Sequence, residues 1–328
     1  TQERGGKGSR GSTTRDEDFL EHLFVATNHN YLLIFTQKGR CYWMRVFDIP
    51  EGTRQSKGRA IQNMVQLEGG DKVLAYINVT DLKTEEYLNN HYVVLVTKKG
   101  VIKKTTLEAY SRPRANGIIA VGIREGDELL EAKLTNGNSH IIIASKAGKA
   151  VHFEEDRVRA MGRGASGVRG MLLAGDKDEV VGMVSVSKEE TADTQVLVVS
   201  EKGYGKRSPV EEYRITNRGG KGVKTIQVTD KTGSLIAIKA VKDDDQLMII
   251  NRSGITIRMD LSNMRVLGRA TQGVRLINLG KNDEIAAVAK VDSSLKEEAD
   301  AGEVAGGTSG EEGTAGNDEA PENGTEIE

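Results

Sequence analysis

The sequence of 328 residues has few of the residues on which several protein classes depend. Its single cysteine, Cys41, excludes an internal disulfide and a thiolate metal site, as is typical of a reducing compartment. The five histidines are scattered without the HExxH spacing of a catalytic zinc site. No apolar run exceeds about six residues, whereas roughly 18 to 20 are needed to span a bilayer. We therefore expect a cytoplasmic protein with no membrane partner.

Proline is rare and glycine is abundant. The four prolines and 38 glycines favour many tight turns between short strands over a proline-rich linker. Aromatic residues make up only 4% of the chain and are not interleaved with basic residues. This composition argues against stacking on single-stranded bases and favours contact with the backbone of a duplex.

The formal charge of −2 hides two regions of opposite charge. Residues 292–328 contain 12 acids and one base, a net charge of −11, so residues 1–291 carry +9. The body of the chain therefore suits a polyanion partner. The tail, 292–328, is rich in Gly, Glu, Ala and Thr, and we expect it to be disordered, either only solubilising the chain or competing with the polyanion. Because the sequence starts at Thr1, we expect it to be a piece of a longer polypeptide.

Five copies of an apolar, β-rich run followed by a turn ending in glycine organise residues 1–291. The turns lie at residues 36–39, 97–100, 145–148, 200–203 and 251–254, with a mean period of about 54 residues. Thr, Ser or Asn at the first turn position can hydrogen-bond its own backbone, and glycine accepts the positive φ that closes a hairpin. Each copy therefore predicts a β-hairpin, whose uninterrupted apolar first strand indicates burial on both faces.

A second element, rich in glycine and basic residues, follows each hairpin. These elements include residues 57–59, 114–117, 163–167, 218–222 and 269–273. A turn and a further strand come next, so each repeat has about four short strands and little helix. Such units bury both faces by stacking radially into a propeller-like disc. Residues 4–27 resemble the second half of a repeat, which gives five units and a partial one.

No catalytic constellation is present. Each Gly-Lys pair lacks the Ser or Thr that completes a phosphate loop, and the GxGxxG match at residues 162–167 lacks a βαβ context. We therefore predict no catalytic residue, no cofactor site and no metal site in this chain.

Lysines and arginines recur at the same phases of every repeat. In the hairpin turns and return strands they are Lys38, Arg40, Arg45, Lys98, Lys99, Lys103, Lys104, Lys146, Lys149, Lys202, Lys206, Arg207, Arg252 and Arg258. In the glycine-basic elements they are Arg54, Lys57, Arg59, Arg112, Arg114, Arg159, Arg163, Arg169, Arg214, Arg218, Lys221, Lys224, Arg265, Arg269 and Arg275. Equivalent positions of radial repeats lie on a circle, so we expect a basic rim that binds duplex DNA, with glycines letting backbone N–H groups approach phosphate. The alternative is that the cations only protect β-edges and keep the surface soluble.

Residues 2–8, Gln-Glu-Arg-Gly-Gly-Lys-Gly, resemble the seven-residue box that marks the C-terminal domain of the A subunit of bacterial DNA gyrase. Residues 19–39, 58–61, 112–118 and 161–169 are also similar to that family, and the resemblance covers nearly all of residues 2–291. It implies an all-β, six-bladed β-pinwheel over residues 1–291 that wraps duplex DNA around its rim without sequence preference. It also implies that the domain enables ATP-dependent negative supercoiling by the whole enzyme, a type II DNA topoisomerase.

The resemblance carries over to individual residues of the box. Gln2, Arg4, Gly5, Gly6, Lys7 and Gly8 fit it, with Arg4 and Lys7 as the expected phosphate contacts. Glu3 places a negative charge where the family has a basic residue. Residues 218–222 repeat the Arg-Gly-Gly-Lys-Gly pattern and are expected to make an auxiliary contact.

The partners that the resemblance implies are duplex DNA, the upstream cleavage domain of the gyrase A subunit and the gyrase B subunit, in a heterotetramer of two A and two B subunits. The cleavage tyrosine, ATP and Mg²⁺ belong to those other parts, so no cofactor is expected in this chain. Two alternatives stay open: the equivalent domain of topoisomerase IV, which generally lacks the box, and a propeller-like scaffold that binds proteins through its face.

Overall fold

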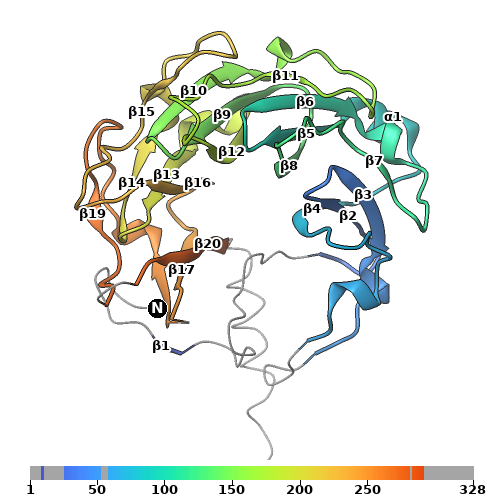
Figure 1. Cartoon of the computed structure of the whole chain (residues 1–328), viewed down its shortest axis with the longest axis horizontal. Helices are drawn as coiled ribbons and strands as arrows, with labels where there is room; N and C mark the ends of the chain where they lie inside the picture. The colour runs from blue at the N-terminus through green and yellow to red at the C-terminus, as the bar shows by residue number, and fades with distance from the viewer. Residues whose placement is uncertain (1–8, 11–25, 53–57, 254, 281–282, 292–328) are drawn as a thin grey trace, which may run out of the picture. The chain divides into compact units, whose positions relative to one another are not determined.

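The computed structural model describes residues 9–10, 26–52, 58–253, 255–280 and 283–291. All of them belong to the first of two units, residues 1–292 and 293–328. Within this unit the described strands form five four-stranded antiparallel sheets, named blades 1 to 5. The blades follow one another around an arc (Figure 1), which confirms the all-β, propeller-like fold.

Each blade is built on a β-hairpin at the predicted place. Its first strand is β2 (Tyr31–Thr36), β5 (Tyr92–Thr97), β9 (Ser139–Ser145), β13 (Gln195–Ser200) or β17 (Gln246–Asn251). Its return strand is β3 (Arg40–Arg45), β6 (Val101–Thr106), β10 (Lys149–Glu154), β14 (Tyr204–Pro209) or β18 (Ile255–Asp260). Gly39, Gly100, Gly148 and Gly203 close their turns with φ of 79°, 81°, 76° and 82°, a conformation that glycine adopts without a steric cost. Gly254 lies outside the described residues.

An inner and an outer strand flank each hairpin. The inner strands are β4 (Val73–Val79), β8 (Leu129–Thr135), β12 (Val180–Ser187), β16 (Leu235–Val241) and β20 (Ile285–Val291). The outer strands are β7 (Ile118–Ile119), β11 (Val168–Arg169), β15 (Val223–Lys224), β19 (Val274–Arg275) and β1 (Ser9–Arg10). Figure 1 places β7, β11, β15 and β19 on the outside of the arc.

The outer strand of a blade comes from the following repeat. β7 lies after the hairpin β5–β6 in the chain but pairs with β3, and β11, β15 and β19 are shifted in the same way. β1 pairs with β18 in blade 5, where Arg10 lies opposite Ile255 in the register of Arg275 opposite Tyr204 in blade 4. The partial repeat expected at the N-terminus thus supplies the outer strand of blade 5, the last of the five sheets that the described residues form.

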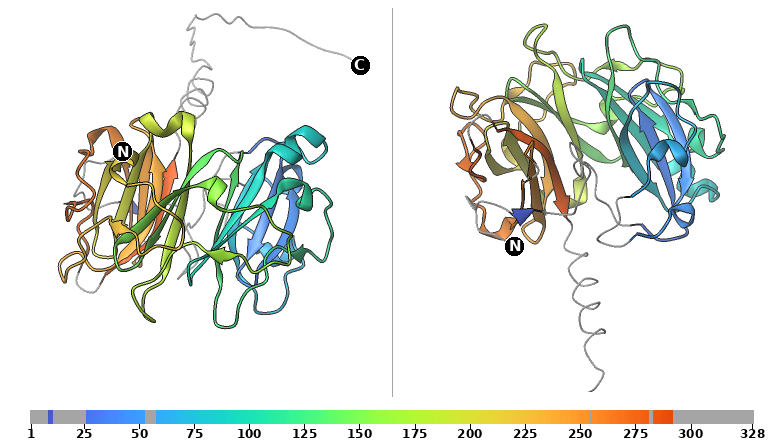
Figure 2. Two further views of the ribbon diagram at one scale, coloured as in Figure 1. Left: turned by 90° about the horizontal axis from the view of Figure 1, so that it is seen from above. Right: turned by 60° about the horizontal axis from the view of Figure 1, so that its bottom comes forward.

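The hydrophobic core lies between neighbouring blades, which stand side by side in Figure 2. Alternate residues of a first strand point to opposite sides of its sheet. Leu33 and Phe35 of blade 1 pack with Val93 and Leu95 of blade 2, whereas Leu32 packs on the other face of blade 1. This two-sided burial explains the uninterrupted apolar runs.

Buried aspartates bind the hairpin turns to the entry of the inner strand. Asp71 accepts the backbone N–H of Lys38 at 3.1 Å, and Asp127 accepts that of Lys99 at 2.9 Å. Helix is sparse in the described part of the chain, as expected. It comprises α1 (Glu85–Asn90) and the 3₁₀ helices η1 (Val46–Asp48), η2 (Ile61–Asn63), η3 (Leu107–Tyr110), η4 (Glu155–Arg157), η5 (Lys188–Asp193), η6 (Val210–Glu212) and η7 (Leu261–Asn263).

Candidate nucleic-acid interface

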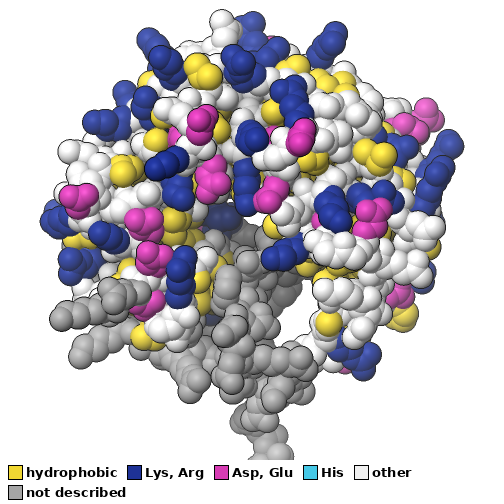
Figure 3. Space-filling model, in the orientation of Figure 1, with side chains coloured by type: hydrophobic (Ala, Val, Ile, Leu, Met, Phe, Trp, Pro, Cys, Tyr) yellow, Lys and Arg dark blue, Asp and Glu magenta, His cyan; other side chains and the backbone are white. Residues whose placement is uncertain are grey.

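The segments that cross from each repeat to the outer strand of the preceding blade are strongly basic. The four that the structure describes in full are residues 111–119, 159–169, 214–224 and 265–275, together called the crossing belt. They contain twelve lysines and arginines and no aspartate or glutamate. In Figure 3, lysine and arginine side chains recur along the outer edge of the face in view. The belt therefore concentrates positive charge on the perimeter.

The outer strands carry the most regular cations of the belt. Arg169, Lys224 and Arg275 are the second residues of β11, β15 and β19, and all three are exposed. In β7 this place is taken by Ile119, whose side chain is 54% exposed. One equivalent position is thus basic in three of the four belt segments.

Two lysines of blade 3 form a like-charged pair. Lys224 of β15 lies directly opposite Lys149 of β10, and neither side chain has a hydrogen bond or ion pair among the described residues. Like charges opposite each other on one face of a sheet destabilise it. An anion between the two ammonium groups would relieve this repulsion.

Two arginines bind the belt to itself. The Nε of Arg269 donates to the carbonyl oxygen of Glu212 at 2.9 Å, and its Nη1 to that of Lys224 at 2.8 Å. Arg218 makes the equivalent bonds one blade earlier, to Arg157 at 3.0 Å and Arg169 at 3.1 Å. Each half-buried guanidinium thus ties its own loop to the outer strand of the preceding repeat. These bonds take two of its five donors, so its first role is structural.

Glycines allow the crossing loops to lie against the return strands. Gly222 has φ of 72°, and a Cβ there would overlap the carbonyl oxygen of Ala150. Gly167 is in the same position against the carbonyl oxygen of Ile102. Within the crossing belt, the expected approach of glycine to phosphate fits the open positions Gly162 and Gly164, where no heavy atom would contact a Cβ within 4 Å.

In three of the five hairpin turns, one cation is paired with a glutamate at the entry of the neighbouring inner strand. The pairs are Lys98–Glu128 at 2.6 Å, Lys146–Glu179 at 3.7 Å and Arg252–Glu284 at 3.1 Å. The hydrogen bond from Lys98 holds the pKa of Glu128 below its ordinary value. These turns therefore have a more neutral surface than the belt.

Four cations predicted for the rim are buried instead. They are Lys103, Lys104, Lys206 and Arg207, with exposed fractions of 1%, 6%, 0% and 5%. The crossing segment of the next repeat covers their return strands, since Ala160 bridges to Lys104 and Val266 to Arg207. Their prediction as DNA contacts is wrong, because a polyanion cannot reach them. These cations do lie on the return strands, but a segment from another repeat covers them.

The remaining predicted cations differ in what they bind. Arg59, Lys99, Arg112, Arg114, Arg159, Arg214, Lys221 and Arg265 are exposed and Arg163 is half-buried, and none of these side chains has a hydrogen bond or ion pair within the described residues. Those that bind the chain itself are Lys38, Arg40, Arg45, Lys202 and Arg258. Arg54, Lys57, the box at 2–8 and the tail at 292–328 lie outside the described residues.

The sequence prediction omitted Arg10. This residue ends β1 and occupies the outer-strand place of Arg169, Lys224 and Arg275. The available signal was spacing: Arg10 follows Gly8 by two residues, as Arg169 follows Gly167.

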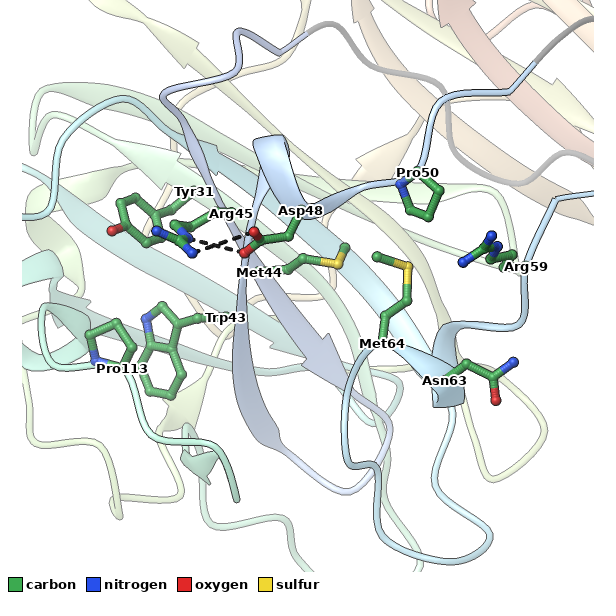
Figure 4. A pocket seen from close by; sticks show the side chains of 10 residues that line it. All are labelled: Tyr31, Trp43, Met44, Arg45, Asp48, Pro50, Arg59, Asn63, Met64 and Pro113. Atoms are coloured by element: carbon green, nitrogen blue, oxygen red, sulfur yellow. Dashed lines mark hydrogen bonds and ion pairs between the residues drawn. The ribbon is translucent and has the colours of Figure 1, made fainter.

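An open depression on blade 1 offers no catalytic chemistry. Its volume is about 580 Å³, and it is lined by Tyr31, Trp43, Met44, Arg45, Asp48, Pro50, Arg59, Asn63, Met64 and Pro113 (Figure 4). Arg45 and Asp48 form an ion pair there at 3.0 Å. Across the described part of the chain, no group of His, Cys, Asp or Glu could hold a metal ion, and no helix is long and apolar enough to cross a membrane.

Fold and surface together define an all-β propeller domain with a basic perimeter. The sequence matches the family profile "DNA gyrase C-terminal domain, beta-propeller" over residues 1–27, 30–78, 91–136, 139–187, 194–242 and 245–292. The chain belongs to this family. The six matched segments correspond to the partial repeat and the five complete ones.

Known proteins agree with this assignment. The A subunit of DNA gyrase from Staphylococcus aureus (strain NCTC 8325) is 40% identical over 333 residues, which cover 100% of this chain and 37% of the relative. The chain thus spans just over a third of that relative. A solved DNA gyrase A C-terminal domain has a TM-score of 0.73 and 26% identity, covering 89% of this chain and 92% of that one. The C-terminal domain of a DNA topoisomerase IV shares the fold, with a TM-score of 0.72, 22% identity, and coverage of 85% and 84%.

Proposed function

We propose that this chain binds duplex DNA along the crossing belt and wraps it around the perimeter without reading its sequence. The observation that carries the proposal is the belt, twelve cations and no acids that one repeated topology places on the outside of successive blades. Wrapping by this domain serves ATP-dependent negative supercoiling by a complete gyrase. The cleavage domain of the gyrase A subunit and the gyrase B subunit are its partners there.

The energetics require many contacts. Bending 20 to 30 base pairs smoothly by 40 to 90° costs on the order of 1 to 6 kcal/mol. The belt offsets this cost cumulatively, because every described crossing segment adds at least two cations. Binding is then dominated by phosphate contacts, each of which contributes about 0.9 to the slope of log K against log salt.

A topology assay tests wrapping directly. The chain is incubated with nicked circular DNA, the nick is sealed with ligase, and the trapped linking difference is measured. We expect a difference of one sign that grows with the ratio of protein to DNA and disappears at high salt. A DNA population with unchanged linking number at saturating protein would reject wrapping.

The box remains part of the proposal. The spacing from Arg4 to Gly8 equals that from Arg218 to Gly222 and from Arg269 to Gly273. We expect Arg4→Ala with Lys7→Ala to leave binding of short duplexes nearly intact while abolishing wrapping and, in the assembled enzyme, supercoiling. Lys83→Ala with Lys177→Ala, two exposed lysines outside the belt, is the control for lost charge. Supercoiling at the wild-type level would refute the role of the box.

The two alternatives make different predictions. A scaffold that binds proteins does not shift a duplex of about 150 base pairs, one persistence length of DNA, in a gel. A topoisomerase IV domain is disfavoured, because the 40% identical relative belongs to a gyrase whereas the similarity to the topoisomerase IV domain shows the fold alone.

A further inference from the structure

Two lysines are fully buried on return strands without an ion pair among the described residues. Lys103 of blade 2 is 1% exposed and Lys206 of blade 4 is 0% exposed. An ammonium group is costly to remove from water unless its donors are satisfied. Because both side chains are buried, they cannot contact DNA. Other interactions must therefore offset the free-energy cost of removing their ammonium groups from water.

Both ammonium groups donate to the backbone of the crossing belt. Lys206 Nζ bonds to the carbonyl oxygen of Gly268 at 2.7 Å, to that of Arg269, and to Thr271 Oγ1 at 3.2 Å. All three acceptors lie in one crossing loop, residues 268–273, which has no regular secondary structure.

Lys103 makes the equivalent contacts two blades earlier. Its Nζ donates to the carbonyl oxygen of Ala120 at 2.5 Å and to that of Arg163 in the crossing loop 162–167. Ala120 directly follows β7, so this one ammonium group joins the end of one crossing segment to the loop of the next.

The fold does not require a lysine at this position. The equivalent residues of the other blades, which pair with the same place on the first strand, are Tyr42, Val151 and Ile257. Two of these are aliphatic, so an apolar side chain fills the space adequately. What distinguishes the two lysines from these residues is therefore their hydrogen bonds to the crossing loops.

We propose that Lys103 and Lys206 are positioning residues for DNA binding, each fixing the crossing loop of the next repeat so that the belt presents its cations at the perimeter. This inference rests on the proposed function of the belt. The loops that they hold, 162–167 and 268–273, each precede an outer strand ending in an exposed arginine, Arg169 or Arg275.

The surroundings of both lysines make the interaction sensitive to pH. Burial, with the neighbouring Arg163, lowers the pKa of Lys103 to about 8. Burial also lowers the pKa of Lys206 to about 8, with Arg269 lowering it and Glu212 opposing the shift. Tyr110 and Tyr213 lie near the two sites, and burial raises the pKa of each well above this range, so they do not titrate with the lysines.

Between about pH 8 and 10.5, the effect of the two lysines on stability has the opposite sign to their effect on the loops. Weaker wrapping at high pH therefore would not reflect a loss of the fold. Both folded-state pKa values lie below the ordinary 10.5, so between about pH 8 and 10.5 the unfolded chain binds more protons. The two groups therefore add stability as the pH rises through this window. Their bonds to the loops weaken in the same window, because a neutral amine is a poorer donor to carbonyl oxygen.

The test uses a double variant of the full chain that carries Lys103→Met and Lys206→Met. It is compared with the wild type and with a charge-matched control that carries Lys83→Met and Lys177→Met. We expect amide hydrogen exchange in loops 162–167 and 268–273 of the free protein to become about tenfold faster in the double variant while the hairpin strands keep their protection. We also expect its trapped linking difference at pH 7 to fall at least threefold. The control should match the wild type in both.

A pH titration of the unmodified chain is the second measurement. Wild-type wrapping should decrease from pH 7 to 9, and the double variant should not show this decrease. Unchanged loop exchange, or wild-type wrapping by the double variant, would overturn the positioning role. If the wild type itself traps no linking difference, the proposed function fails, and loop exchange still decides whether the lysines fix the loops.

Discussion

The crossing belt and the hairpin turns both carry cations in every described repeat, but they differ in what surrounds those cations. In the turns, Lys98, Lys146 and Arg252 each lie beside a glutamate at the entry of the adjacent inner strand. In the belt there is no acid at all, and side chains such as Arg169 and Lys224 have no protein partner among the described residues. Recurrence of a cation in every repeat therefore does not by itself make a surface positive. The presence or absence of a neighbouring acid decides the net charge there.

The largest expected effect separates the two regions directly. Arg169→Gln, Lys224→Gln and Arg275→Gln remove one equivalent belt cation from each of three blades. We expect the salt slope of duplex binding to fall by about 2.7 and affinity at 0.1 M salt to fall by up to about 500-fold. Lys98→Gln, Lys146→Gln and Arg252→Gln remove the same charge from the turns, and should change affinity less than about threefold because these cations are already paired. Equal losses, measured by fluorescence anisotropy, would break the comparison.

A second variant sharpens the distinction within the belt. Arg269→Ala removes the bonds to the carbonyl oxygens of Glu212 and Lys224. We expect the free energy of unfolding to fall by about 1 to 2 kcal/mol, because the two hydrogen bonds that tie the loop to its neighbours are lost. Arg265→Ala, on the same segment but without such bonds, should change stability by less than about 0.5 kcal/mol and weaken DNA binding. Urea unfolding checks both, and equal midpoints would show that the guanidinium bonds do not stabilise the belt.

A gain of function is the next smaller effect. Ile119 stands where the other described segments have Arg169, Lys224 and Arg275, and it is largely exposed. Ile119→Arg extends the belt to blade 1, and one added phosphate contact should raise affinity at 0.1 M salt by up to about eightfold. Ile119→Gln is the control for lost apolar surface. No gain from arginine over glutamine would place the DNA path away from blade 1.

The smallest effect concerns the tail. Deletion of residues 292–328 removes a net charge of −11, and if the tail competes for the belt, affinity at 50 mM salt should rise about threefold. The rise should vanish at 1 M salt, where the Debye length is about 3 Å. Unchanged affinity and wrapping at low salt would leave the tail as a solubilising segment only.

The local part of the fold was predictable because its determinants are adjacent in sequence. A polar first residue and a closing glycine, as in Thr36 and Gly39, specify a hairpin by their own turn chemistry. The uninterrupted apolar run of β13 likewise indicated burial on both faces, and its residues do divide between two cores. Repetition of these signals then defined the number of units.

The pairing of distant segments was not predictable in the same way. The outer strands are two residues long and bind a hairpin from another repeat, so no local pattern marks them. This explains why Lys103 and Lys206 were predicted for the basic rim. Their recurrence in the repeat is visible in the sequence, but the segment that covers them comes about 60 residues later. The bonds of Arg218 to backbone carbonyls escaped prediction for the same reason. The position of a residue in the repeat tells which strand carries its side chain. Whether that side chain is exposed depends on the crossing segment that the next repeat lays over the strand.

The donation of outer strands also constrains how such a domain can be cut or lengthened. Because each blade takes its edge from the next repeat, and blade 5 takes its edge from β1, no blade is a self-contained module. Excision of one repeat would leave the preceding sheet without an edge and the excised piece without a partner. Loss of the first ten residues would remove the edge of blade 5, the blade farthest from them in sequence. The N-terminal strand and the last blade are thus joined in one sheet. Adding or removing a repeat would therefore change the strand pairing of two blades at the same time.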